Sequence, residues 1–140
     1  MGGHKHIETC IGTYIASRYT SAVEVGIGKN TVAARVIRDA GKNIRCTDVR
    51  QTIPIEGLDF FVDDVFEPDF SLYLGAEVIY AIRPAIEMIP PLISLARHTG
   101  ADLLVYHLGF ERYGNGGRTL DCGVVLHQYY SREKPSKRVT

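Results

Sequence analysis

Short apolar runs alternate with segments of helical periodicity along this chain, and this alternation restricts its fold most. We expect strands at 22–25, 43–49, 58–64, 76–82, 101–108 and 123–130. Helices are expected at 7–19 and at 30–40, where Gly41 supplies a stop signal. Strands that alternate with helices favour parallel pairing, because a parallel return needs a crossover that covers one face of the sheet. The pattern therefore predicts an α/β fold of three layers, with a mostly parallel sheet of about six strands.

One further helix is expected at 84–98, where Pro84 suits the first turn. Pro90 and Pro91 lie inside this span, and a proline in a helix interior costs about 3 kcal/mol. We therefore predict a break near Ile89 that divides the segment into two shorter helices.

The connecting segments refine the predicted sheet. The linkers at 49–57 and 65–75 are too short for full crossover helices. The segment 109–122 is rich in glycine and lacks helical periodicity, so it most easily joins an antiparallel pair. The strand at 123–130 should therefore run antiparallel to the strand at 101–108. A glycine-rich loop of this kind is either a ligand-binding loop or a hairpin connection without a ligand.

Length and composition allow one compact core. A chain of 140 residues with 45% hydrophobic content buries roughly two thirds of its unfolded surface and is too short for two such cores. We expect a single domain over residues 1–130 and a polar, basic, disordered tail at 131–140. No apolar run reaches the ~20 residues of a membrane span and no signal peptide opens the chain, so we expect a cytoplasmic protein.

Charge and cysteine content exclude several classes of site. Sixteen basic and sixteen acidic residues cancel, which removes the global electrostatic case for nucleic acid. The three cysteines, Cys10, Cys46 and Cys122, are widely spaced and form no CxxC pair. We therefore expect three buried, reduced thiols, with neither a disulfide framework nor a metal site. His4 and His6 near the start of the chain are assigned no function.

The turn between the first strand and the next helix is the first candidate for a ligand site. In an open α/β sheet, ligands bind beyond the carboxyl ends of the strands, commonly at this turn. Gly26 and Gly28 stand there, and glycine permits positive φ and close approach of a ligand. Two glycines alone also fit a tight turn without a ligand. Thr31 occupies the third glycine position of the dinucleotide pattern, which argues against a nicotinamide cofactor.

Two carboxylates strengthen the prediction of a ligand. Glu24 lies among apolar residues of the first strand, and a buried carboxylate needs donors or a cation nearby. Asp48 ends the second strand twenty residues after Gly28, a spacing at which a carboxylate binds the ribose hydroxyls of a nucleotide.

Three stretches resemble a known family in order and spacing. VEVGIGKNT (23–31), CTDV (46–49) and FVDDVFEP (61–68) resemble the first three motifs of the class I S-adenosylmethionine-dependent methyltransferases. The resemblance covers about residues 20–107 and implies a Rossmann-like fold of truncated methyltransferase topology, with S-adenosylmethionine as cofactor. The small size and the YAIRP ending at 80–84 are also similar to an uncharacterised group of short archaeal proteins with this fold.

The resemblance also implies roles for individual residues. Glu24, Gly26 and Gly28 would hold the methionine end of the cofactor, and Asp48 would bind its ribose. Asp64 would meet the adenine amine, with Val65 or Phe66 against the adenine ring.

The candidate catalytic residues stand at strand ends and in the glycine-rich loop. They are Tyr80, Arg83, His107 and Glu111. His107 has the pKa range of a general base, although a histidine in an apolar strand is also typical of a satisfied core residue. Arg83 is suited to clamp a carboxylate or phosphate, and its alternative role is an ion pair with Glu87, four residues further on.

Three functions follow from these observations. The first is a methyltransferase-type protein that binds S-adenosylmethionine and acts on an acceptor that the sequence does not identify. The second is a non-catalytic interaction module, for example a homodimer formed through a sheet edge or the first helix. The third is an enzyme that binds NAD or another adenine nucleotide.

Overall fold

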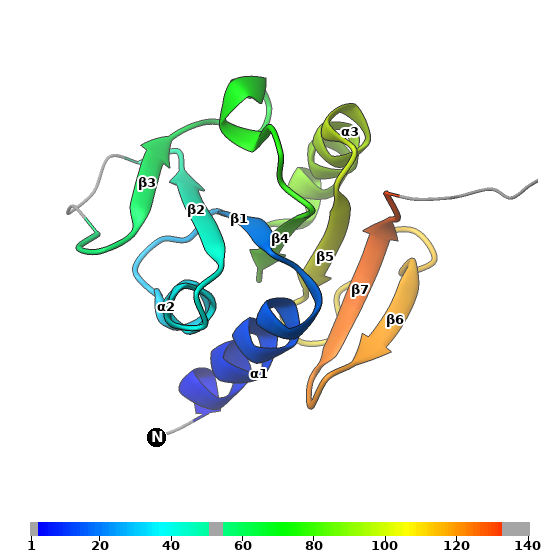
Figure 1. Cartoon of the computed structure of the whole chain (residues 1–140). Coiled ribbons are helices and arrows are strands. Elements are labelled where there is room, and N and C mark those ends of the chain that lie inside the picture. The colour runs from blue at the N-terminus through cyan, green and yellow to red at the C-terminus, as the bar shows by residue number, and fades with distance from the viewer. Residues whose placement is uncertain (1–2, 51–54, 133–140) are drawn as a thin grey trace, which may run out of the picture.

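The computed structural model describes residues 3–50 and 55–132, which form a seven-stranded sheet with three α-helices (Figure 1). The elements are α1 (Gly3–Arg18), β1 (Ser21–Val25), α2 (Val32–Asp39), β2 (Asn43–Asp48), β3 (Asp59–Val62), the 3-10 helix η1 (Phe70–Tyr73), β4 (Val78–Ile82), the 3-10 helix η2 (Ile86–Met88), α3 (Ile89–Thr99), β5 (Asp102–Tyr106), β6 (Arg118–Asp121) and β7 (Val125–Tyr130). Among the described residues, none of the helices has the length and apolar character needed to cross a bilayer.

The sheet is mostly parallel, with the strand order β3-β2-β1-β4-β5-β7-β6. The strands β1 to β5 pair in parallel, and β7 runs antiparallel to both β5 and β6. The α/β class and the antiparallel pairing of the last strand are therefore confirmed, and the sheet is consistent with a Rossmann-like fold. The strand order reverses between β1 and β4, which is where open α/β sheets bind ligands.

Helices cover both faces of the sheet. Side chains of β1 alternate between the faces, so that Ala22 packs with α1 and α2 whereas Val23 and Val25 pack with α3. Because both faces are covered, the central strands β1, β4 and β5 are buried almost throughout. Two buried clusters, one on each face, make up the core.

The number of strands differs from the six predicted, because β6 lies inside the segment expected to be a loop. Its four residues are mostly exposed, and only Leu120 is half-buried and packs against the core. A short, polar edge strand carries too few apolar positions to produce a period-2 pattern. The linkers after β2 and β3 contain no α-helix in their described parts.

The three α-helices begin at other positions than predicted, and α2 differs least, since it starts at Val32 rather than at residue 30. The helix α1 starts at Gly3 rather than at residue 7. The helix α3 starts at Ile89 rather than at Pro84, and Pro90 and Pro91 stand in its first turn, where a missing N–H removes no helical hydrogen bond. Since η2 precedes it as a separate turn, the predicted break near Ile89 is present.

The start of the predicted tail is docked on the sheet. The backbone N–H of Arg132 donates to the carboxylate of Asp102 at 2.7 Å, and the Tyr19 hydroxyl donates to the same carboxylate at 2.6 Å. The chain is therefore ordered beyond residue 130, and residues 133–140 lie outside the described part.

Candidate functional site

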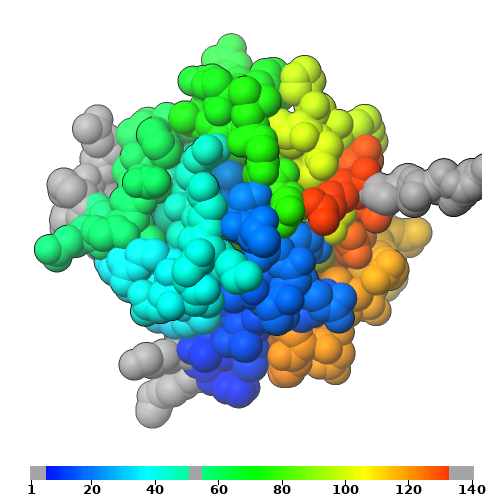
Figure 2. Space-filling view, in the orientation of Figure 1, coloured from blue at the N-terminus to red at the C-terminus, as the bar shows by residue number. Residues whose placement is uncertain are grey.

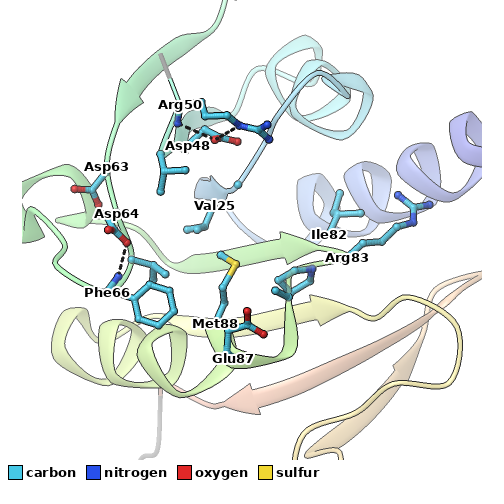
Figure 3. A pocket seen from close by; sticks show the side chains of 15 residues that line it. Val25, Asp48, Arg50, Asp63, Asp64, Phe66, Ile82, Arg83, Glu87 and Met88 are labelled. Atoms are coloured by element: carbon cyan, nitrogen blue, oxygen red, sulfur yellow. Dashed lines mark hydrogen bonds and ion pairs between the residues drawn. The ribbon is translucent and has the colours of Figure 1, made fainter. Parts of the chain in front are cut away.

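A hollow of about 360 Å³ lies at the carboxyl ends of β1, β2 and β4 (Figure 3). Its walls come from four segments of the chain: Val25 and Gly26, then Asp48 to Arg50, then Asp63 to Phe66, and finally residues from Ile82 to Met88. The hollow thus lies where the strand order reverses, and its volume falls in the range of small-molecule sites. We call it the switch-point pocket.

The glycine turn after β1 needs both of its glycines. Gly26 and Gly28 have φ angles of 74° and 57°, a region that side chains with a Cβ rarely adopt. The N–H of Gly26 donates to the Thr47 carbonyl at 2.8 Å, and the N–H of Gly28 donates to Asp48 Oδ2 at 2.8 Å. The turn is therefore tied to the end of β2, and the Gly28 N–H is already engaged by a carboxylate of the protein.

The Asp48 carboxylate can still accept hydrogen bonds from a ligand. It is 7% exposed and accepts the Gly28 N–H on one oxygen and the Arg50 N–H, at 3.1 Å, on the other. The Arg50 side chain lies 3.8 Å from Asp48 Oδ1 but is largely exposed. An ionised carboxylate has about four lone-pair sites, so about half of its accepting capacity remains.

The third predicted motif forms another wall of the switch-point pocket. Asp64 Oδ1 accepts the Phe66 N–H at 2.9 Å, which fixes the turn after β3. Val65 is buried, whereas the Phe66 side chain is exposed at the rim. Asp63 Oδ2 accepts the Tyr73 hydroxyl at 2.6 Å. The structure thus brings four predicted ligand residues, Gly26, Asp48, Asp64 and Val65, to one pocket.

Glu24 lies in the core beneath the pocket and does not line it. It is 2% exposed, and its Oε1 accepts the Tyr80 hydroxyl at 2.8 Å. Burial raises the pKa of Glu24 to about 8, so the carboxyl group is mostly neutral at pH 7. Tyr80 is equally buried, and its pKa is well above the usual value because of burial and the neighbouring Glu24. Gly28 is also absent from the pocket wall.

Arg83 lines the pocket with its stem, while its guanidinium turns away toward α1 (Figure 3). Its Nη1 donates to Glu8 Oε2 at 2.9 Å, and the Asn30 amide donates to the same oxygen at 2.7 Å. The ion pair of Arg83 is therefore with Glu8 rather than with Glu87. Glu8 is 1% exposed, and its Oε1 has no partner among the described residues.

Glu8 was not among the residues predicted for the site, although its position in the sequence indicated a buried acid. It lies three and seven residues before Ile11 and Ile15, which form the buried face of α1. An acid on the apolar face of a predicted helix needs a partner, by the same reasoning that drew attention to Glu24.

Arg83 also has an unusual backbone conformation. Its φ is 56°, and it is the one non-glycine residue with positive φ in the described parts of the chain. Its N–H donates to the Tyr106 carbonyl at 2.6 Å, and its guanidinium lies 5.3 Å from the centre of the Tyr106 ring. Strain of this kind persists where surrounding contacts fix it, and it gathers at ligand sites.

His107 and Glu111 lie outside the switch-point pocket. His107 is 4% exposed, its Nε2 lies 2.7 Å from the Tyr129 hydroxyl, and its ring packs edge-on against His127. Burial and the neighbouring His127 lower its pKa. Glu111 is exposed in the loop after β5. His107 is thus buried in the core, but it is not fully satisfied there, because its Nδ1 has no hydrogen-bond partner among the described residues.

The pocket wall is acidic. Four carboxylates line it, from Asp48, Asp63, Asp64 and Glu87, whereas of the two lining arginines, Arg50 and Arg83, the second turns its guanidinium away toward Glu8. Because Glu8 already pairs with Arg83, the remaining excess of negative charge favours a cationic ligand. Among the described residues, no three His, Cys, Asp or Glu side chains are grouped to hold a metal ion.

Comparison with known proteins identifies relatives along most of the chain. A protein of Archaeoglobus fulgidus is 40% identical over 96 residues, which cover 68% of this chain and 74% of that protein. A protein of Pyrococcus horikoshii is 34% identical over 112 residues, which cover 76% of this chain and 86% of that protein. Both are described as UPF0146 proteins, and the sequence model "Uncharacterised protein family (UPF0146)" matches residues 8–116. The predicted likeness to a group of short archaeal proteins is thus confirmed, and the chain belongs to the UPF0146 family.

Proposed function

We propose that this protein binds S-adenosylmethionine in the switch-point pocket and acts as a methyltransferase. One observation carries the proposal: Gly26, Asp48, Asp64 and Val65, predicted from three separate motifs, line a single pocket at the point where the strand order reverses. The antiparallel β7 beside β5 also agrees with the methyltransferase-like topology that the sequence suggested.

The charge of the pocket supports a sulfonium ligand over a dinucleotide. S-adenosylmethionine carries a positive sulfonium and an ammonium group, whereas the pyrophosphate of NAD is anionic. A dinucleotide places its pyrophosphate on free N–H groups at the start of the first helix. Here the Gly28 N–H donates to Asp48, and the pocket wall holds more carboxylates than guanidinium groups. Both features oppose an anion and favour a cation.

The residues of the pocket fit the parts of the proposed ligand. Asp48 has accepting capacity for two ribose hydroxyls, and the exposed ring of Phe66 at the rim offers a face for an adenine base. Asp64 can accept the adenine amine, and Gly26 allows close approach of the methionine end. When bound, the ligand would supply an activated methyl group. The protein would contribute mainly orientation, which suffices for an in-line transfer to a good nucleophile.

Calorimetric titration tests the proposal. We expect saturable binding of S-adenosylmethionine and no binding of NAD under the same conditions. The variant Asp48→Asn keeps an oxygen for the Gly28 N–H but loses the charge, so its affinity should fall by about tenfold or more. The matched control Asp59→Asn changes an exposed acid at the other end of β3 and should bind as the unaltered protein does. No saturable heat at millimolar ligand, or equal affinity for Asp48→Asn, would overturn the proposal.

A second candidate function is association through the edge strand β3. This strand ends the sheet, and its Phe61 and Val62 side chains are 38% and 49% exposed. An edge strand with exposed apolar residues is a surface for pairing with another chain. Light scattering should then give the mass of a dimer, and Val62→Lys should reduce it to that of a monomer. A monomeric mass for the unaltered protein would exclude this candidate.

A further inference from the structure

A second hollow, of about 430 Å³, lies between α1 and the turn that joins β6 to β7. Six residues of α1 line it, including Cys10, and Cys122 is the one lining residue from the turn. The two cysteines are 112 positions apart in the sequence, so their sharing of one surface hollow could not be read from their spacing. Figure 2 shows the corresponding contact, with α1 in dark blue against the orange hairpin.

The backbone of the turn comes very close to the Cys10 thiol. Gly123 directly follows Cys122, and a Cβ placed on Gly123 would lie only 3.0 Å from Cys10 Sγ. Gly123 has a φ of 105°, so the turn needs glycine for its conformation as well as for this approach. The residue next to Cys122 in the sequence therefore lies against the Cys10 side chain, and both cysteines line the same hollow.

The prediction of three buried thiols is wrong for two of them, since only Cys46 is buried. Cys10 and Cys122 are partly exposed, and His6 Nε2 lies 3.7 Å from Cys10 Sγ, where it can take up the thiol proton. Burial raises the pKa of Cys122, whose thiol donates to the Val124 carbonyl. Cys46 is fully buried, and its pKa is raised to about 12. Two thiols are thus accessible to a reagent and the third is protected.

We propose that Cys10 and Cys122 form a reversible intramolecular disulfide, which makes this hollow a site of thiol oxidation. A small-molecule disulfide is the oxidant. The Cys10 thiolate attacks one of its sulfurs, forming a mixed disulfide and releasing one small thiolate, while the Cys10 proton goes to His6 or solvent. The Cys122 thiolate then attacks Cys10 Sγ and releases the second small thiolate. Both released thiolates take up protons, so the protein loses two electrons and two protons, and the oxidant gains them.

The proposed bond has a structural consequence. It would tie α1 to the β6–β7 hairpin, two segments near opposite ends of the described chain. Closing so long a loop restricts mainly the unfolded chain, so the oxidised protein should melt several degrees above the reduced one.

The test is oxidation of the native protein with excess oxidised glutathione at neutral pH, followed by peptide mapping without reductant. We expect a Cys10–Cys122 linked peptide, an unmodified Cys46, a raised melting temperature, and reversal of both changes by dithiothreitol. Separate glutathione adducts on Cys10 and Cys122 without a linked peptide, or a linkage between two chains, would overturn the inference. A linked protein with a lower melting temperature would also overturn it, because the thiols would then meet only after α1 had moved.

Single variants separate the steps. Cys10→Ser should leave Cys122 as a stable glutathione adduct, and Cys122→Ser should leave Cys10 in the same state, since each lacks the resolving thiol. Cys46→Ala is the matched control and should still give the linked peptide. A linkage that persists in Cys10→Ser or Cys122→Ser would assign it to Cys46 and contradict the proposed pair.

Discussion

Glu24 carries a carboxyl group that the folded protein keeps protonated. Its pKa is about 8 in the fold against 4.5 for an ordinary glutamate, because burial disfavours the charged form. On unfolding, the group therefore releases a proton at any pH between these values. The free energy of unfolding should fall as the pH rises from about 4.5 to about 8 and should change little above, by a total on the order of a few kcal/mol.

The variant Glu24→Gln isolates this contribution. Glutamine keeps an oxygen for the Tyr80 hydroxyl but does not titrate, so the variant should lose less stability over this pH window than the unaltered protein. Urea unfolding at several pH values measures the difference. If the two proteins change in parallel from pH 5 to pH 8, Glu24 is ionised in the fold and the assignment of a neutral carboxyl is wrong.

Removal of one partner of the Glu8–Arg83 ion pair should strongly lower the free energy of unfolding. Glu8→Ala would leave the Arg83 guanidinium and the Asn30 amide without their shared acceptor, in surroundings where Glu8 is 1% exposed and Arg83 20%. Breaking such a buried pair costs about 3–5 kcal/mol. The double variant Glu8→Met with Arg83→Met should recover part of this loss, because no unpaired charge remains.

Chemical denaturation of Glu8→Met, of Arg83→Met and of the double variant measures this coupling. If the losses in the free energy of unfolding of the two single variants simply add up to that of the double variant, Glu8 and Arg83 are not energetically coupled.

The place of a residue in the pocket could be predicted where the residue lies close in sequence to a recognisable turn. Gly26 and Asp48 were found because a strand end and a fixed spacing identify them, and both line the switch-point pocket. Glu24 was recognised as a buried acid, but the direction of its side chain depends on which face of β1 meets α1 and α2. The partner of Arg83 came from α1, 75 positions away, and local spacing favoured Glu87 instead.

At the scale of elements, the packing of α1 on α2 depends on one glycine. A Cβ on Gly12 would lie 2.8 Å from the Ala33 carbonyl oxygen and 2.9 Å from Val36 Cβ. Gly12→Ala gains about 1 kcal/mol of helix propensity, but it must push the two helices apart. We expect a net loss of about 1–3 kcal/mol in the free energy of unfolding.

The exposed neighbour Thr13 provides the control for this prediction, because Thr13→Ala changes propensity without changing the helix contact. Its stability should stay within about 0.5 kcal/mol of the unaltered protein. A Gly12→Ala variant that is more stable than Thr13→Ala would show that α1 and α2 have room to separate.

Elements with a strong apolar pattern were predictable, and those stabilised by neighbours were not. The strands β2, β4 and β5 lie within their predicted ranges, and β1 begins one residue before its own, because buried parallel strands are continuously apolar. The strand β6 forms only because β7 offers it a partner across a short turn. The break near Ile89 followed from proline chemistry, but the helix does not start at Pro84, because Ala85, with a ψ of 145°, has an extended backbone.

At the scale of the whole molecule, the switch-point pocket joins segments that are far apart in the sequence. Its wall combines the ends of β1, β2 and β4 with the turn after β3 and the last two residues of η2. The sequence predicted a mostly parallel α/β sheet but not the strand order that brings these ends together. The reason is that β1 pairs with both β2 and β4, and pairing between strands far apart in the sequence leaves no local pattern. A ligand that bridges these segments therefore stabilises the assembled fold rather than one element.

Binding of S-adenosylmethionine should accordingly raise the melting temperature. At a ligand concentration one hundred times Kd, the stabilisation is about 2.7 kcal/mol, or on the order of 10 °C for a chain of this size. S-adenosylhomocysteine lacks the sulfonium charge, so at equal concentration it should stabilise the protein less. Glu87→Gln removes one acid from the pocket wall, so it should reduce the difference between the melting-temperature shifts that the two ligands produce. The control Glu56→Gln changes an exposed acid outside that wall and should leave this difference unchanged. Equal shifts by both ligands in every variant would show that the acidic wall plays no part in recognition.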